Sequence, residues 1–157
     1  MRAHFSSLGV IMLNIAIKLS LLSYVVFLFG CSTSTQNIER KNYNNLEDEV
    51  GYFQVVKVNN ILYISGIISD KNTFENQVDD IYNTLKKILR DYNVGTNEIV
   101  KEVIFTTDMK KLKSTISIRR AHFNSKKYPA SSWVQVERLW SPSHFIEVEV
   151  VVILPQI

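Results

Sequence analysis

The feature that most constrains the fold is a long amphipathic stretch between Thr73 and Tyr92. Its apolar side chains recur at spacings of three and four residues, which predicts one helix with a single buried face. Asn72 or Thr73 is the expected N-cap, and Gly95 is expected to close the helix. The apolar positions are Phe74, Val78, Ile81, Tyr82, Leu85, Ile88 and Leu89. A helix of this kind is stable only when its apolar face covers another layer of structure.

Runs rich in β-forming residues supply that layer. Residues 52–58 and 61–68 are separated only by Asn59-Asn60, and because asparagine tolerates positive φ they predict a hairpin. Further strands are expected at 99–107, 131–139 and 145–154, with a second helix at about 111–123. The order is ββαβαββ. It predicts one α+β domain, a mixed sheet with two helices on one face, in a chain of 157 residues.

The N-terminus has the layout of an export signal. Arg2 and Lys18 precede the apolar run "LSLLSYVVFLFG", which polar "CSTSTQ" follows at once. Twelve helical residues rise about 18 Å, too little for a hydrocarbon core of about 30 Å. "LFGC" resembles the lipobox of bacterial lipoproteins, in which the cysteine is lipidated and becomes the N-terminus. Residues 1–30 are therefore expected to be a signal peptide and Cys31 the lipidated residue. Translation could start at Met1 or at Met12. An uncleaved membrane anchor is the alternative.

Residues 31–50 are polar and of mixed charge, which predicts a tether between membrane and domain; an ordered N-terminal arm is the alternative. Without the signal, the formal net charge of +3 loses Arg2 and Lys18, and no run of Lys and Arg remains. Nucleic acid is therefore not an expected partner. No Gly-rich phosphate loop is present and the histidines lack partners at metal-ligand spacing, so neither a cofactor nor a metal is expected.

Residues 51–157 resemble the RidA/YjgF family, which has a chorismate-mutase-like fold. The resemblance rests on "GYFQ", "YISGII", "VGTNEIVKEVIFTTDM", "YPASSWVQVERL" and "FIEVEV", in this order and at compatible spacing. It implies a homotrimer with a small-molecule cleft between subunits, and an activity found in the family, the hydrolysis of reactive enamines and imines such as 2-aminoacrylate.

The resemblance also assigns site residues. An arginine that grips the substrate carboxylate usually follows Pro-Ala in this family, and Ser131 stands at that place. Glu147 matches the acidic residue that positions the attacking water, and is the candidate general base. Tyr52 matches a tyrosine that closes over the ligand. Trp133 lies on the same face of its strand as Ser131 and is expected to fill or roof the cleft.

Each of these residues has a plainer interpretation. Glu147 and Glu149 could be polar groups facing solvent or a subunit boundary, and Tyr52 an amphipathic interface residue. Arg119, Arg120 and Arg138 are expected to be solvated charges and not substitutes for the missing arginine.

The sequence therefore predicts a lipoprotein of the bacterial cell envelope, facing the periplasm or the exterior. Its RidA-like domain would bind a small molecule, with arginine-dependent deaminase activity lost or altered at Ser131. Two alternatives remain: an active enamine or imine hydrolase that uses Glu147 with a different substrate, and a binding module without turnover.

The lipid anchor can be tested directly. Cells fed labelled fatty acid should incorporate the label into this protein, and Cys31→Ala should abolish it because Cys31 is the chain's one cysteine. Unlabelled wild-type protein with an intact Met1 or Met12 terminus would instead identify a plain anchor.

Overall fold

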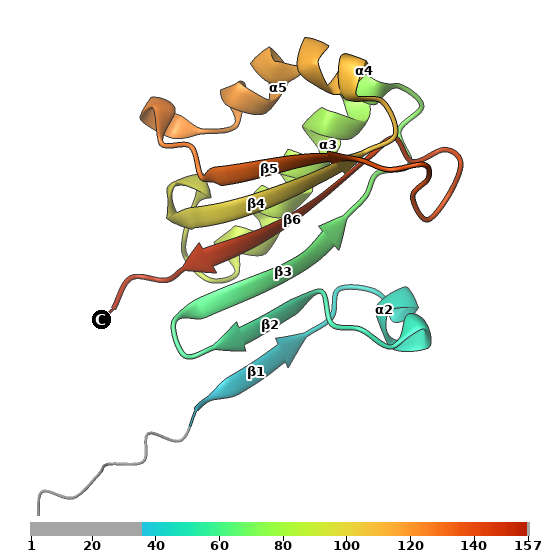
Figure 1. Ribbon diagram of the computed structural model, residues 1–157. Helices are drawn as coiled ribbons and strands as arrows, with labels where there is room; N and C mark the ends of the chain where they lie inside the picture. Colours follow the sequence, from blue (N-terminus) through green and yellow to red (C-terminus); the bar gives the residue numbers. More distant parts are fainter. Residues whose placement is uncertain (1–35, 157) are drawn as a thin grey trace, which may run out of the picture. The chain divides into compact units, whose positions relative to one another are not determined.

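The computed structural model describes residues 36–156, which form one mixed sheet covered by helices (Figure 1). The predicted signal peptide and the predicted lipidation site Cys31 lie outside the described residues. The sheet has six strands in the order β1-β2-β3-β6-β4-β5. The strands are β1 (Ile38–Lys41), β2 (Val55–Val58), β3 (Ile61–Ile67), β4 (Ile99–Thr106), β5 (Ala130–Gln135) and β6 (Ile146–Ile153). Among these described residues, no helix is both long and apolar enough to cross a bilayer.

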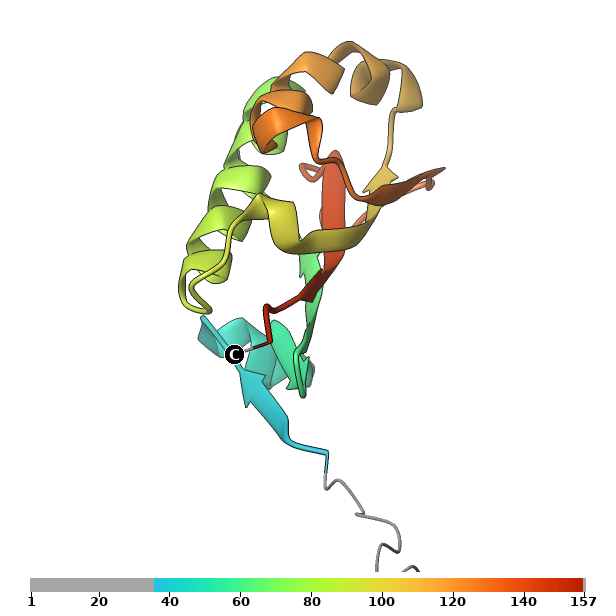
Figure 2. The ribbon, with the colours of Figure 1, turned by 90° about the vertical axis from the view of Figure 1, so that its left-hand side faces the viewer.

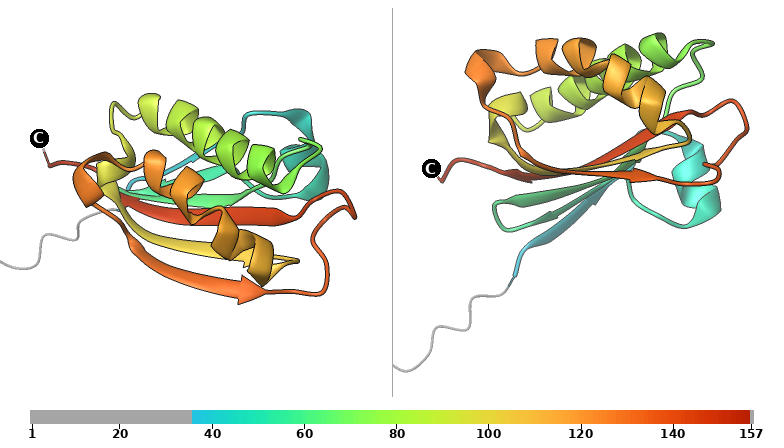
Figure 3. Two further views of the ribbon diagram at one scale, coloured as in Figure 1. Left: turned by 90° about the horizontal axis from the view of Figure 1, so that it is seen from above. Right: turned by 45° about the horizontal axis from the view of Figure 1, so that its top comes forward.

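Neighbouring strands are antiparallel except β4 and β5, which run parallel. A parallel pair needs a crossover, which is made here by α4 (Met109–Ser114) and α5 (Ile116–Ala121). These two helices lie on the same face of the sheet as α3 (Phe74–Arg90) (Figures 2 and 3). The predicted α+β fold, a mixed sheet with its main helices on one face, is confirmed.

α3 is the predicted amphipathic helix. The Thr73 side chain caps it by accepting a hydrogen bond from Asn76 N at 3.2 Å. All seven predicted apolar positions are buried, and so is Gln77. The predicted end was wrong: α3 stops at Arg90 with Asp91 as its C-cap, and Asn93, with φ of 57°, makes the turn that had been expected at Gly95.

Residues 36–50 of the predicted tether are ordered, which corrects that prediction. β1 pairs antiparallel with β2, and α2 (Asn45–Val50) begins with a capping box between Asn44 and Glu47. Lys41 Nζ and Tyr43 Oη both donate to Asp91 Oδ2, at 2.6 and 2.9 Å, so the arm is joined to the end of α3. The compact unit therefore starts at Gln36 and not at Gly51, as in the alternative of an ordered arm.

The second predicted helix is divided in two at Thr115. Its hydroxyl donates to the Leu112 carbonyl oxygen at 2.9 Å, a local bond of the kind that competes with helical backbone bonding. The division separates α4 from α5, and α5 carries a buried Arg119.

Arg119 makes a buried ion pair, so its expected role as a solvated charge was wrong. Glu102 on β4 is fully buried, and its Oε1 accepts from Arg119 Nε at 2.8 Å and from Nη2. Tyr82 Oη on α3 donates to the other carboxylate oxygen at 2.9 Å. These bonds join α3, α5 and β4 through one carboxylate.

Removing one partner of this pair should destabilise the fold. Arg119→Met leaves the Glu102 charge buried without its cation, a change that costs about 3–5 kcal/mol of unfolding free energy. Urea unfolding at pH 7 measures that loss. Arg120→Met on the same helix is the matched control and should cost less than about 1 kcal/mol, because Arg120 is exposed. Equal small losses for the two variants would contradict the importance of the pair.

Candidate functional site

Glu147 stands on β6 opposite an irregularity in β3. The register between the two strands shifts between Ile64 and Ile67, which includes Gly66. A Cβ on Gly66 would overlap the Glu147 carboxylate. The glutamate side chain therefore lies directly over the glycine backbone. Any side chain at position 66 would occupy the same space.

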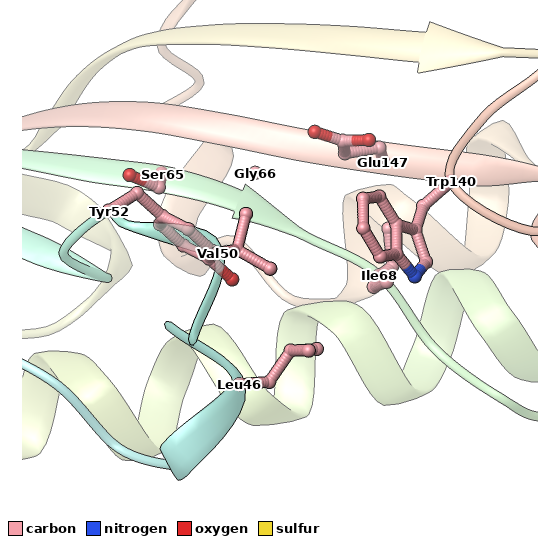
Figure 4. Close-up of a pocket in the computed structure, with 8 residues that line it drawn as sticks. All are labelled: Leu46, Val50, Tyr52, Ser65, Gly66, Ile68, Trp140 and Glu147. Atoms are coloured by element: carbon pink, nitrogen blue, oxygen red, sulfur yellow. The ribbon is translucent and has the colours of Figure 1, made fainter. Parts of the chain in front are cut away.

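A cavity of about 330 Å³ opens beside this carboxylate (Figure 4). Tyr52 and Val50 line one side, Trp140 and Ile68 another, and Leu46 of α2 lies across from Glu147. Ser65 and Gly66 complete the lining, which includes no Lys or Arg. The structure thus brings Tyr52 and Glu147, two of the predicted site residues, to one mostly apolar pocket.

The pocket changes the acidity of its titratable groups. Burial, and then the charge of Glu149, raise the pKa of Glu147 above 4.5, against a smaller opposing effect of His144. Burial, followed by the charges of Glu47 and Glu147, raises the pKa of Tyr52 above its ordinary value. A carboxyl group with a raised pKa in a pocket is a candidate for proton exchange with a bound molecule.

Ser131, the residue at the predicted clamp position, is engaged elsewhere. Its Oγ donates to Glu102 Oε1 at 2.7 Å and accepts from Trp133 Nε1 at 2.6 Å. The Trp133 ring also lies over the Arg119 guanidinium, with 5.9 Å between the Arg119 Cζ and the ring centre. Ser131 and Trp133 therefore belong to the hydrogen-bond network around the buried ion pair.

The strand registers place these two groups of residues on opposite faces of the sheet. Ser131 pairs with buried Glu102 on β4, and Trp133 packs against the core on the helix-covered face. Glu147 pairs with Phe105 and so points to the other face, since side chains alternate along a strand. Trp133 does not line the Glu147 pocket, and the predicted site residues are not gathered in one place.

Sequence reasoning missed three residues. Trp140 and Gly66 line the Glu147 pocket, and Glu102 is the acid of the buried ion pair. Trp140 was assigned to a loop between strands, although its exposed side chain lines the pocket. Gly66 was present in the quoted "YISGII", where a glycine within a strand pattern signals a bulge or a close approach. Glu102 had a weaker signal, an acidic side chain on the buried face of an alternating strand.

The two histidines with buried side chains each contact one carboxylate. His122 Nε2 lies 3.0 Å from Asp79 Oδ1, and His144 Nε2 lies 2.9 Å from Asp70 Oδ1. Nowhere in residues 36–156 do three or more His, Cys, Asp or Glu side chains form a group that could hold a metal ion.

Solved structures share this fold. A member of the YjgF/YER057c/UK114 family from Mycobacterium tuberculosis superposes with a TM-score of 0.70 at 19% identity, covering 75% of this chain and all of that one. Yeast Mmf1 superposes with a TM-score of 0.63 at 25% identity, over 77% of this chain and all of Mmf1. The domain is thus an α+β domain of the YjgF type.

Sequence comparison assigns the family. Residues 43–154 match the family described as Endoribonuclease L-PSP, and the chain belongs to this family, the RidA/YjgF family. Mitochondrial protein Mmf1 of Saccharomyces cerevisiae is 32% identical over 95 residues, 56% of this chain and 65% of the yeast protein. A RutC family protein of Aquifex aeolicus is 32% identical over 110 residues, 65% of this chain and 87% of that protein.

The raised pKa of Glu147 predicts a pH-dependent stability. Above 4.5 and up to its folded pKa, the folded protein retains a proton that the unfolded chain releases, so unfolding free energy falls as pH rises through this window. Glu147→Gln removes that loss. The variant should gain stability relative to wild type on going from pH 4 to pH 7, as measured by urea midpoints. Glu137→Gln on an exposed loop is the control; a parallel pH profile for wild type and Glu147→Gln would contradict the assignment.

Proposed function

We propose that this domain binds a small, mostly apolar molecule in the Glu147 pocket and lacks the arginine-dependent deaminase activity that the family resemblance implies. The observation that carries this proposal is the bonding of Ser131. Its hydroxyl is held by Glu102 and Trp133, and the lining of the Glu147 cavity contains no cation. The apolar side chains of that lining instead suit a ligand with little charge.

The chain offers no simple replacement for the clamp near Ser131. Arginine grips a carboxylate through two parallel donors, which a single hydroxyl does not reproduce. The guanidinium closest to Ser131 in the bonded network is that of Arg119, and Glu102 already neutralises it. A short amino-acid-derived enamine would therefore lose the contact that orients it.

An active hydrolase is the second candidate, and the environment of Glu147 favours it. Burial raises the pKa of this carboxyl group, as expected for a residue that exchanges protons with a bound molecule. Tyr52 lines the same pocket. In this alternative Glu147 activates water against a substrate that is held by something other than residue 131.

One assay tests whether the 2-aminoacrylate activity implied by the resemblance is absent. Purified protein is added to 2-aminoacrylate generated in the reaction, and release of pyruvate is compared with the protein-free rate. We expect no acceleration by wild type, because the carboxylate clamp is absent. Acceleration that disappears in Glu147→Gln but persists in Glu75→Gln, an exposed position on α3, would replace the binding proposal with the hydrolase.

We also propose that Cys31 holds the domain at a membrane of the bacterial cell envelope, on its periplasmic or exterior side. The ordered arm makes such an attachment short. Gln36, where the compact unit starts, is five residues beyond Cys31, and at 3.3–3.6 Å per extended residue this connection reaches at most about 18 Å. A domain attached in this way stays close to the bilayer.

The sheet face opposite the helices supports a homotrimer, the assembly implied by the resemblance. Apolar side chains on this face are exposed; they are Ile38, Tyr63, Val134 and Ile153. Exposed apolar surface of this kind is typical of subunit interfaces, and closed cyclic assembly is a common way to bury it.

Light scattering tests the assembly. Residues 36–157 should have three times the subunit mass, and Tyr63→Asp should lower that mass by placing a charge in the interface. Ile116→Asp on α5, also a partly exposed apolar position, is the control and should leave the mass unchanged. A wild-type monomer at micromolar concentration would contradict the trimer.

A further inference from the structure

A second cavity, of about 670 Å³, lies next to the Glu147 pocket. The segment between β5 and β6 forms most of its wall, and Thr107 after β4 contributes the rest. Trp140 lines both cavities, so its indole is their common wall. This side chain is 67% exposed, which leaves a large aromatic surface to be covered by a ligand.

The second cavity differs from the first in having a positively charged side chain in its lining. Arg138 lines it and takes part in none of the ion pairs found among the described residues. Arg119, by contrast, is buried and paired with Glu102. Glu137 lines the same cavity and weakens its attraction for anions. Arg138 is thus the guanidinium available to a ligand that reaches past Trp140.

His144 also lines this cavity and is only 4% exposed. Its Nε2 lies 2.9 Å from Asp70 Oδ1.

We infer that the ligand is a carboxylate with an extended apolar body. Arg138 holds the carboxylate in the second cavity, the body crosses Trp140, and the apolar end lies beside Glu147. This inference rests on the proposed binding in the Glu147 pocket and names its ligand class. It also gives a reason for the loss of the clamp at Ser131: the anionic group is recognised on the β5–β6 segment, and a three-carbon acid is too small to occupy both cavities.

Calorimetry of the full-length protein in detergent tests the inference with two ligands of the same shape, 3-phenylpropionate and 3-phenylpropionamide. Hydrogen bonds to charged groups contribute about 1.5–3 kcal/mol, so wild type should bind the carboxylate roughly tenfold or more tightly than the amide. Arg138→Gln should abolish this preference. Arg120→Gln, on the exposed side of α5, should retain it.

Two further variants test which end of the ligand lies in which cavity. Glu137→Gln should increase the preference for the carboxylate, because it removes the opposing charge from the second cavity. Val50→Asp should weaken both ligands, because Val50 lines the Glu147 cavity and not the second one.

The outcomes separate this inference from the function on which it rests. Equal binding of amide and carboxylate by wild type, or a preference that survives Arg138→Gln, overturns the role of Arg138 and leaves apolar binding at Glu147 standing. Failure of both ligands to bind overturns both.

Discussion

The buried carboxylate of Glu102 is the interaction on which the helix-covered face depends. A charge taken out of water is tolerated only when its oxygens are fully bonded, and here Arg119, Tyr82 and Ser131 supply the donors. They come from α5, α3 and β5 respectively. One carboxylate therefore fixes how α5 and β5 pack against α3, and Ser131, the residue at the predicted clamp position, is one of its donors.

The sheet consequently separates structural from binding chemistry. Its covered face contains the ion pair and the side chains of Ser131 and Trp133, whereas Glu147 points to the other face. Among the described residues, no hydrogen bond links the ion-pair network to Glu147. Changes around Glu102 should therefore affect folding before they affect the pocket.

Local patterns in the sequence predicted α3, β3, β4 and β6 well, because periodic burial leaves a periodic trace. The strand predicted at 131–139 was too long: β5 ends at Gln135, and its mostly exposed residues show no such period. β1 left no such trace: all four of its residues are exposed, so the strand resembles a polar tether. Arg119 was misjudged because its partner is 17 residues away on another element. The sequence placed Ser131 on a strand, but it did not show which face of the sheet the side chain points to. That face depends on the strand register, and a shift of one residue reverses it.

Glu147 has room for its carboxylate because residue 66 is a glycine. The carboxylate fits because Gly66 has no side chain, so the shape of the pocket depends on a residue with no chemistry of its own. A search for reactive side chains would pass over it. It follows that one added methyl group at position 66 would force the Glu147 carboxylate to move, without any change to the glutamate itself.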